Sequence, residues 1–451
     1  MRHRNFVLFV ALIVGCPAMA LAQARDASSA YGISARVAPR PYLNMPHRAD
    51  GPMPRLLSET GAFGDLRQLS PDRHLIPYDL VVAFWSDGAV KSRWAAIPNQ
   101  KIKISPTGEW QFPAGTVFVK HFDLPVDEEN PNVRRRLETR LLVRDSTGGV
   151  YGVTYKWRAD ESDAELLTNS VTEDIAIRTT SGGVRHQTWY YPSRKDCLTC
   201  HTAGAGGVLG VKTRQMNHDL AYPGGVTDNE LRTWNHLGLF APALNSEDLS
   251  AFTTLAAADD ATRSLEDRAR SYLDANCSHC HRPGGTVAYF DARYTTPLND
   301  QGLINGPVLL DQGIDRPRII SPHDTWRSIA YMRVSTNGDI RMPPLARETI
   351  DDQGVALLGE WINSLPGRAV LSPPTMSQAG GTFSEPVEVA LQDAEPGADI
   401  RYTVDGSEPG TSDPRYETPI KLTASTILRA RAYKDGFTRS ITSQEVYVVG
   451  P

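Results

Sequence analysis

Cysteine, helical patterning and long apolar segments are all scarce in this sequence. Only five of the 451 residues are cysteines, and the formal net charge of −5 argues against nucleic acid as a general partner. After residue 24, no segment approaches the roughly 20 apolar residues that a membrane-spanning helix needs. A phosphate-binding loop, an HExxH zinc pattern and a nucleophile triad are also absent. With 36 glycines and 32 prolines, the chain is expected to contain many turns and a large β fraction.

The start of the chain is predicted to be a secretory signal peptide. MRHRN is basic, FVLFVALIV is apolar, and small residues precede a cleavage point after Ala22 or Ala24. IVGC also fits a bacterial lipoprotein signal in which Cys16 carries a lipid, although the apolar PAMALA that follows is a poor tether. We therefore expect a soluble protein that is periplasmic or secreted, with a lipoprotein anchored through Cys16 as the alternative.

The other four cysteines form two pairs with identical spacing, each followed directly by histidine. The motifs are CLTCH and CSHCH, made by Cys197, Cys200, His201, Cys277, Cys280 and His281. A zinc ribbon would leave both histidines without a role, and a thioredoxin-like pair needs no following histidine. Disulfides across so small a gap would stabilise little. Cys-x-x-Cys-His is the attachment motif of haem c, so the sequence predicts two covalently attached haems.

The spacing of the motif has a physical reason. Positions i, i+3 and i+4 of a helical turn share one face. Both sulfurs therefore reach the two vinyl groups of one porphyrin while the imidazole coordinates the iron. The four cysteines are predicted to bind the cofactor and the two histidines to ligate its iron.

The second motif lies between two predicted helices. One covers residues 265–276, and the other, in TIDDQGVALLGEWINSLP, begins at a Thr349/Asp352 capping pattern and ends at Pro366. ISPHDTWRSIAYMRVS is predicted to form a helix between them. This arrangement resembles a class I cytochrome c, in which a loop such as GDIRMPPL supplies a thioether as sixth iron ligand. The resemblance implies that role for Met342.

The first motif has no such Met-Pro element, and its sixth ligand stays open. TDNELRTWNHLGLF is predicted to be a short helix. The candidate ligands are Met216, His218, His121, His186 and His74. Met216 is preferred because it follows His201 closely in a returning loop, and His121 shares an apolar strand face with Val117 and Val119.

The chain divides into five predicted segments. These are a signal peptide at 1–24, a β-rich N-terminal domain at 25–190, a first haem c region at 191–262, a class I cytochrome c-like domain at 263–366 and a β-sandwich at 372–450. WQFPAGTVFVKHFDL is predicted to be a strand, and RLETRLLVRDSTGGVYGVTYKW a hairpin. The predicted fold class is multidomain α+β, with mainly α-helical cytochrome c haem domains and a C-terminal immunoglobulin-like β-sandwich.

Two resemblances extend this interpretation. RYTVDGSEPGTSDPRYETPIKLTASTILRARAYKDG closely resembles the β-sandwich at the C-terminus of chitobiase and β-hexosaminidase-like proteins. It implies an accessory module open to glycan or protein contact, and sugar binding does not follow from it. AFWSDGAVKSRW, YPSRKDCLTCH, VLGVKTRQMN, ANCSHCH and RMPPL resemble a family of bacterial dihaem c-type cytochromes.

The physiological reaction is not carried over from that family, and two functions remain for a chain with two attached haems. The favoured one is an exported electron carrier that exchanges electrons with a redox protein partner in the periplasm or envelope. The alternative is a dihaem peroxidase-like oxidoreductase, in which one haem keeps an open site. No catalytic residue is assigned, because no acid–base pair suited to peroxide cleavage stands near the first motif.

Overall fold

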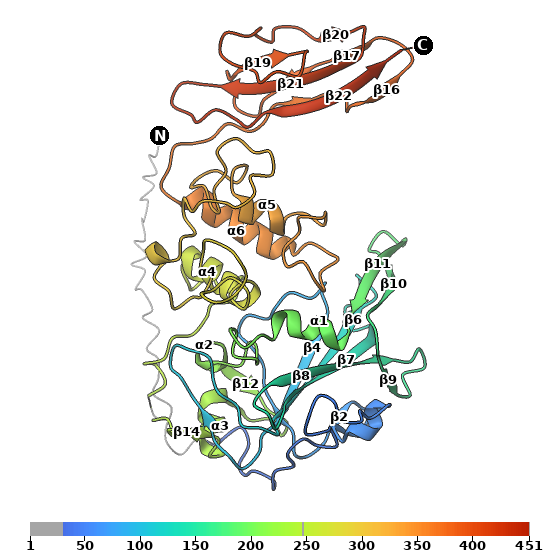
Figure 1. The fold of residues 1–451 in the computed structure, drawn as a ribbon, viewed down its shortest axis with the longest axis vertical. Helices are drawn as coiled ribbons and strands as arrows, with labels where there is room; N and C mark the ends of the chain where they lie inside the picture. The colour runs from blue at the N-terminus through green and yellow to red at the C-terminus, as the bar shows by residue number, and fades with distance from the viewer. Residues whose placement is uncertain (1–29, 246–247, 451) are drawn as a thin grey trace, which may run out of the picture.

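The computed structural model describes residues 30–245 and 248–450. The predicted signal peptide and Cys16 lie outside these residues. The molecule is elongated, with an N-terminal sheet at one end, a segment of short helices in the middle and the C-terminal strands at the other end (Figure 1). Within the described ranges, no helix has the length and apolar character needed to cross a membrane.

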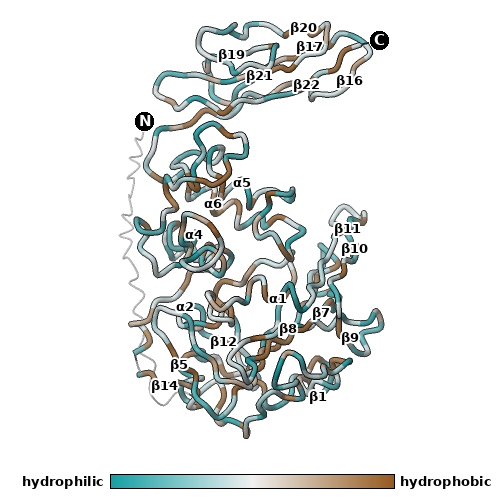
Figure 2. Tube along the Cα trace, viewed as in Figure 1, coloured by the Kyte–Doolittle hydropathy of each residue, from teal (hydrophilic) through white to brown (hydrophobic). Residues whose placement is uncertain are grey.

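A six-stranded antiparallel sheet forms the centre of the N-terminal part. Its order is β3 (Ile76–Pro77), β4 (Val90–Ala96), β6 (Val117–Pro125), β7 (Arg134–Arg144), β8 (Val150–Trp157) and β9 (Ala164–Leu166). The predicted strand is confirmed as part of β6, and the predicted hairpin as β7 and β8. Because side chains alternate across a strand, Val117 and Val119 pack in one core while Phe118 packs in a second. Figure 2 shows apolar residues concentrated around β7 and β8.

Smaller elements surround this sheet. They are a 3-10 turn η1 (Leu57–Thr60) and the pairs β1 (Phe63–Asp65) with β2 (Ser70–Pro71), β5 (Ile102–Lys103) with β14 (Phe240–Ala241), β10 (Val171–Arg178) with β11 (Val184–Tyr191), and β12 (Asp219–Ala221) with β13 (Thr227–Asn229). The β5–β14 pair is parallel and joins two segments that are far apart in the sequence. The predicted N-terminal domain therefore shares a sheet with the region after the first motif.

The prediction of mainly α-helical haem domains is wrong. The helices of the described residues are short: α1 (Arg194–Cys200), α2 (Thr213–Met216), α3 (Glu230–His236), α4 (Leu265–Asn276), α5 (Ile329–Val334) and α6 (Asp352–Ser364). Strand and loop make up most of the described chain. Between residues 283 and 328 the structure has only the 3-10 turn η2 (Leu298–Asp300). Five prolines in that range remove backbone donors and prevent a helix from propagating: Pro283, Pro297, Pro307, Pro317 and Pro322.

The helices predicted from apolar stripes do form. Helix α4 matches the predicted range, and α3 covers part of TDNELRTWNHLGLF. Helix α6 begins two residues later than the Thr349/Asp352 capping pattern predicted, because Asp351 caps it: its carboxylate accepts from Gly354 N at 3.0 Å. Helix α5 covers six residues of the predicted intervening helix.

The C-terminal residues form the predicted β-sandwich-like domain. A four-stranded sheet has the order β16 (Gly381–Phe383), β22 (Ser443–Val449), β21 (Thr426–Tyr433), β19 (Asp399–Thr403), and β17 (Val387–Val389) pairs with β20 (Ile420–Leu422) and β15 (Thr375–Met376) with β18 (Leu391–Gln392). Its core contains Leu428, Ala430 and Tyr447, which have no exposed surface. The buried guanidinium of Arg327 donates to the carbonyls of Arg439 at 3.1 Å and Ser440 at 3.0 Å, so the domain packs on the helical segment.

Candidate cofactor sites

Helix α1 carries the first Cys-x-x-Cys-His motif. Ser193 caps it: its hydroxyl accepts from Asp196 N at 3.3 Å, and the Asp196 carboxylate accepts from Ser193 N at 2.8 Å. The helix lies against β8 at Gly152, where a Cβ atom would stand 2.7 Å from Cys197 Sγ. Only glycine allows this approach, so the sheet positions the cysteine.

The imidazole of His201 is held as a metal ligand would be. Its Nδ1 lies 2.9 Å from the Gly207 carbonyl, to which it can only donate, and this leaves the lone pair on Nε2. Burial lowers the pKa of His201 to about 4, against the opposing effect of that hydrogen bond. A neutral imidazole with a fixed tautomer is the form that binds iron.

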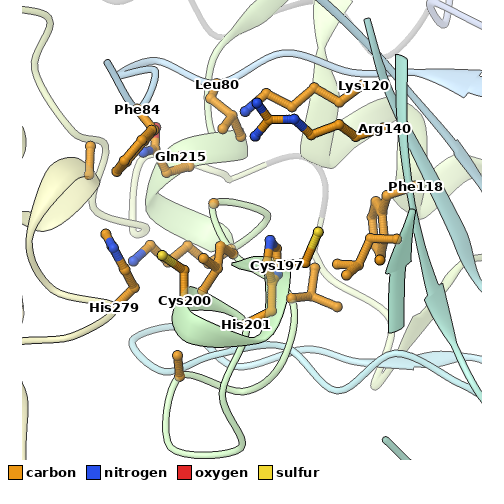
Figure 3. Close-up of a pocket in the computed structure, with 18 of the residues that line it drawn as sticks. Leu80, Phe84, Phe118, Lys120, Arg140, Cys197, Cys200, His201, Gln215 and His279 are labelled. Carbon is orange, nitrogen blue, oxygen red and sulfur yellow. The ribbon is translucent and has the colours of Figure 1, made fainter. Parts of the chain in front are cut away.

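A large cavity opens beside this motif. It contains about 1380 Å³ of empty space, its open mouth included. Cys197, Cys200 and His201 line it, and Figure 3 shows their side chains turned toward the same space. Leu80, Phe84 and other apolar residues complete the wall. The apolar lining and the donor set fit a porphyrin.

Cationic side chains line the opposite side of the cavity. In the sheet register, Arg93 on β4 faces Lys120 on β6, which faces Arg140 on β7, so the three form one row across three strands. Figure 3 shows the amine of Lys120 and the guanidinium of Arg140 close together above the motif. The sequence analysis overlooked this row, although the alternation in GTVFVKHF places Lys120 on the face opposite His121.

The members of the row differ in their partners. Arg93 pairs with Asp79, and Arg140 donates to Glu138 through Nε at 2.9 Å. Lys120 makes no hydrogen bond or ion pair with any described residue, and its Nζ lies over the Phe122 ring, 4.8 Å from the centroid. Burial, followed by the charges of the neighbouring cations, lowers the pKa of Lys120 well below its ordinary value.

The second motif follows α4 directly. Burial lowers the pKa of His281 to about 4, and its ring stacks on Phe290 with 4.3 Å between centroids. The buried Nδ1 of His281 has no hydrogen-bond partner among the described residues, so the neutral ring has a nitrogen available to a metal. This site also fits the predicted ligand.

The Met342 loop lies near this histidine. Met342 N donates to Arg333 O at 2.9 Å, and the Arg333 charge contributes to the lowered pKa of His281. Arg347, which is buried, donates to the carbonyls of Met342 and Val334, both at 2.7 Å. These bonds hold the loop against the end of α5.

The fold brings the two motifs together. A Cβ atom on Gly204, just after the first motif, would stand 3.1 Å from Gly284 O, just after the second. The thiols of Cys200 and Cys280 also act on each other, which raises the pKa of Cys200 and lowers that of Cys280. Arg282 donates to Gly204 O at 3.3 Å and to Glu109 at 2.8 Å. Two segments that are separated by almost eighty residues thus meet at their cysteines.

The residues proposed as sixth ligand of the first site lie elsewhere. Met216 has no exposed surface and packs in the apolar core with Trp110 and Trp234, while its neighbour Gln215 lines the cavity. His218 lies 3.0 Å from Glu230. The remaining histidines are also outside the cavity lining: His121, between Thr139 and Asp123; His74, beside Asp72; and His186, exposed on β11.

One residue that the sequence analysis set aside as a spacer lies in the cavity. His279, inside CSHCH, lines the wall and contacts Phe84 edge-on, with 5.5 Å between ring centroids. No sequence signal marks this position, because it depends on how the second motif packs against the first. In the described part of the chain, no group of three or more His, Cys, Asp or Glu side chains is arranged to hold a bare metal ion.

Comparison with known proteins assigns one part of the chain. Residues 378–444 match the family model of the chitobiase/beta-hexosaminidase C-terminal domain, which confirms the resemblance noted for the sandwich. No curated protein matches the chain significantly. The match covers the accessory module and leaves the cysteine motifs outside it.

Proposed function

We propose that the protein is an exported dihaem c-type cytochrome that transfers electrons between redox partners in the periplasm or envelope. The observation that carries the proposal is the meeting of two Cys-x-x-Cys-His motifs, where Arg282 beside the second motif donates to Gly204 O beside the first. When bound, the haems would supply reversible one-electron oxidation and reduction of iron.

The chain's own residues support two attachment sites. Cys197 and Cys200 would hold one porphyrin against β8, and Cys277 and Cys280 the other at the end of α4. His201 presents a neutral imidazole because Gly207 accepts its Nδ1–H. Contact between Cys200 and Cys280 would place the two attached edges side by side, a short path for electrons within one chain.

Apolar side chains beside the second motif support a protein partner. Val287 is 80% exposed and Tyr289 is 56% exposed, and both follow CSHCH closely. An exposed apolar patch of this kind marks contact sites of soluble proteins. The sandwich domain is a second surface for glycan or protein contact, compatible with its family.

The cationic row also favours a second candidate function. If no side chain ligates the first iron, Lys120 and Arg140 face an open site and could bind an anionic or peroxide substrate there. This is the dihaem peroxidase-like alternative. Spin state separates the two functions, because a carrier needs six-coordinate iron and an open site gives a high-spin one.

Haem stoichiometry tests the proposal. The full chain, produced with a cytochrome c maturation system, should bind two haems per polypeptide in a pyridine haemochrome assay. Cys197→Ala/Cys200→Ala and Cys277→Ala/Cys280→Ala should each remove one haem. Cys16→Ser is the matched control, since this cysteine has no histidine beside it and its loss should leave the count at two. A wild-type count near zero would refute the function.

A further inference from the structure

Lys120 is the one cation of the cavity row without a carboxylate partner among the described residues. Its two neighbours in the register, Arg93 and Arg140, are paired with Asp79 and Glu138. An ammonium without a carboxylate partner, in a cavity wall between two guanidinium groups, is unfavourable in its charged form. The structure therefore favours a role in which this amine is neutral.

The amine lies on the side of the cavity that faces His201. Among the charged groups that act on the His201 imidazole, Lys120 has the largest effect, ahead of His279 and Arg140. Figure 3 shows the Lys120 side chain reaching from β6 into the space above the motif. Lys120 and His201 therefore line the same cavity from different elements, and a porphyrin bound there would lie between them.

A haem propionate is the rival partner for this amine. If the amine paired with a propionate, its removal would leave the ligands of the iron unchanged, so an unchanged iron signal in Lys120→Ala would favour this rival.

Gln215, another polar residue of this wall, already has hydrogen-bond partners. The Gln215 carboxamide donates to Val82 O at 2.8 Å and accepts from Val82 N at 2.9 Å. The apolar residues Leu80 and Phe118 have no donor atom. His279 also lines the cavity and is the rival nitrogen ligand. It belongs to the second motif, however, and its ring packs on Phe84.

We infer that Lys120 is the sixth ligand of the iron held by His201, through its neutral amine. This inference rests on the proposed function, because it requires a haem at the first motif. The amine lone pair forms the coordinate bond, and any proton on the amine leaves to solvent. The first site would then be six-coordinate with two nitrogen ligands, in contrast to the sulfur ligand expected at Met342.

The test compares Lys120→Ala and Lys120→Met with wild-type full-length protein carrying both haems. Electron paramagnetic resonance and near-infrared magnetic circular dichroism of the ferric protein should show a low-spin iron with histidine and amine ligands. Lys120→Ala should convert that iron to high spin, and Lys120→Met should give a thioether signal or a high-spin iron. Cyanide affinity of this site should rise at least about tenfold in Lys120→Ala, because no internal ligand competes.

Matched variants make the outcome decisive. Lys91→Met removes a neighbouring lysine whose Nζ donates to Phe84 O at 2.8 Å, and its spectra should equal those of the wild type. His279→Ala tests the rival nitrogen ligand. An unchanged signal in Lys120→Ala, a high-spin first iron in the wild type, or loss of the signal in His279→Ala alone would overturn the inference. If only the second motif binds haem, the proposed function fails first, and the haem count reports that separately.

Discussion

Asp274 is the most consequential buried charge between the two motifs. It lies on α4, three residues before Cys277, and its carboxylate is fully buried. It accepts from Arg214 at 2.8 and 3.1 Å, lies 2.9 Å from Lys212 Nζ, and accepts from Tyr294 N at 3.0 Å. Asp274 therefore ties the segment after the first motif to the helix that carries the second.

Asp274→Asn should destabilise the protein strongly. The substitution removes the charge of the closest anion of two buried cations, since the side chains of Lys212 and Arg214 are at most 5% exposed and only Lys212 has a second carboxylate nearby, Glu109 at 3.9 Å. Removing one partner of a buried ion pair costs about 3–5 kcal/mol. That is a large share of the roughly 5–15 kcal/mol by which folded domains are stable.

Denaturant unfolding, followed by tryptophan fluorescence and haem absorbance, measures the loss. Glu266→Gln is the matched control on the same helix, since Glu266 is 46% exposed and 3.5 Å from Arg270. Such an exposed pair contributes about 0.3–0.5 kcal/mol. If Asp274→Asn costs no more than the control, the reasoning about this network is refuted.

The same residue predicts an acid dependence. Burial opposes ionisation, but the charges of Lys212 and Arg214 outweigh it and hold the pKa of Asp274 well below the ordinary value of 3.8. Its folded pKa is below the unfolded one, so its stabilisation is complete above pH about 4 and is lost as the pH falls. In Asp274→Asn, the free energy of unfolding should therefore fall less steeply with decreasing pH, below about pH 4, than in the wild type.

Three further predictions concern separate parts of the chain. Met342→Leu should remove the far-red charge-transfer band of ferric histidine–methionine haem, and an unchanged ferric spectrum would contradict the assignment. Although burial opposes it, hydrogen bonds from Lys156 and Arg135 lower the pKa of Glu173 to about 2. The stabilisation of the fold by ionised Glu173 is therefore complete above pH about 4.5 and is lost toward pH 2. Glu173→Gln should lower the free energy of unfolding by about 1 kcal/mol near neutral pH, measured by urea unfolding. A chain ending at Gly367 should keep both haems and their spectra, because the sandwich lines neither motif; loss of either haem would contradict this.

Local patterns in the sequence predicted local structure well. The alternation in RLETRLLVR and VYGVTYKW defined the β7–β8 hairpin, and the apolar stripe of LEDRARSYLDAN defined α4. The turn-separated strands after residue 372 defined the sandwich. These elements follow from side-chain periodicity, which the nearest neighbours in the chain enforce.

The amount of helix was overestimated because the class I resemblance rested on the ends of the second haem region. The apolar stripes at 265–276 and near 352–364 are real, but the prolines and glycines between them form loops. A resemblance carried by short motifs does not fix the structure of the residues between those motifs.

The cavity wall was missed for a different reason. Alternation along GTVFVKHF gives two faces, and the sequence analysis favoured the one with His121. The structure buries that face against Trp157 and turns the Lys120 face toward α1. Which face a distant helix covers is decided by long-range packing, so periodicity alone cannot choose between them.

The segment around Trp85 explains why the predicted haem regions do not behave as separate modules. Trp85 N donates to Asn276 Oδ1 at 2.8 Å, beside the second motif, and Trp85 Nε1 donates to Thr349 O at 3.2 Å. The Asp87 carboxylate accepts from the backbone of Glu348 and Thr349, both at 2.9 Å. AFWSDG thus fastens the N-terminal sheet to both ends of the second haem region. Because the sheet supplies one wall of the first cavity and this segment contacts the residues beside the second motif, the loop before β4 contributes to the spacing between the two attachment sites, together with the Asp274 network.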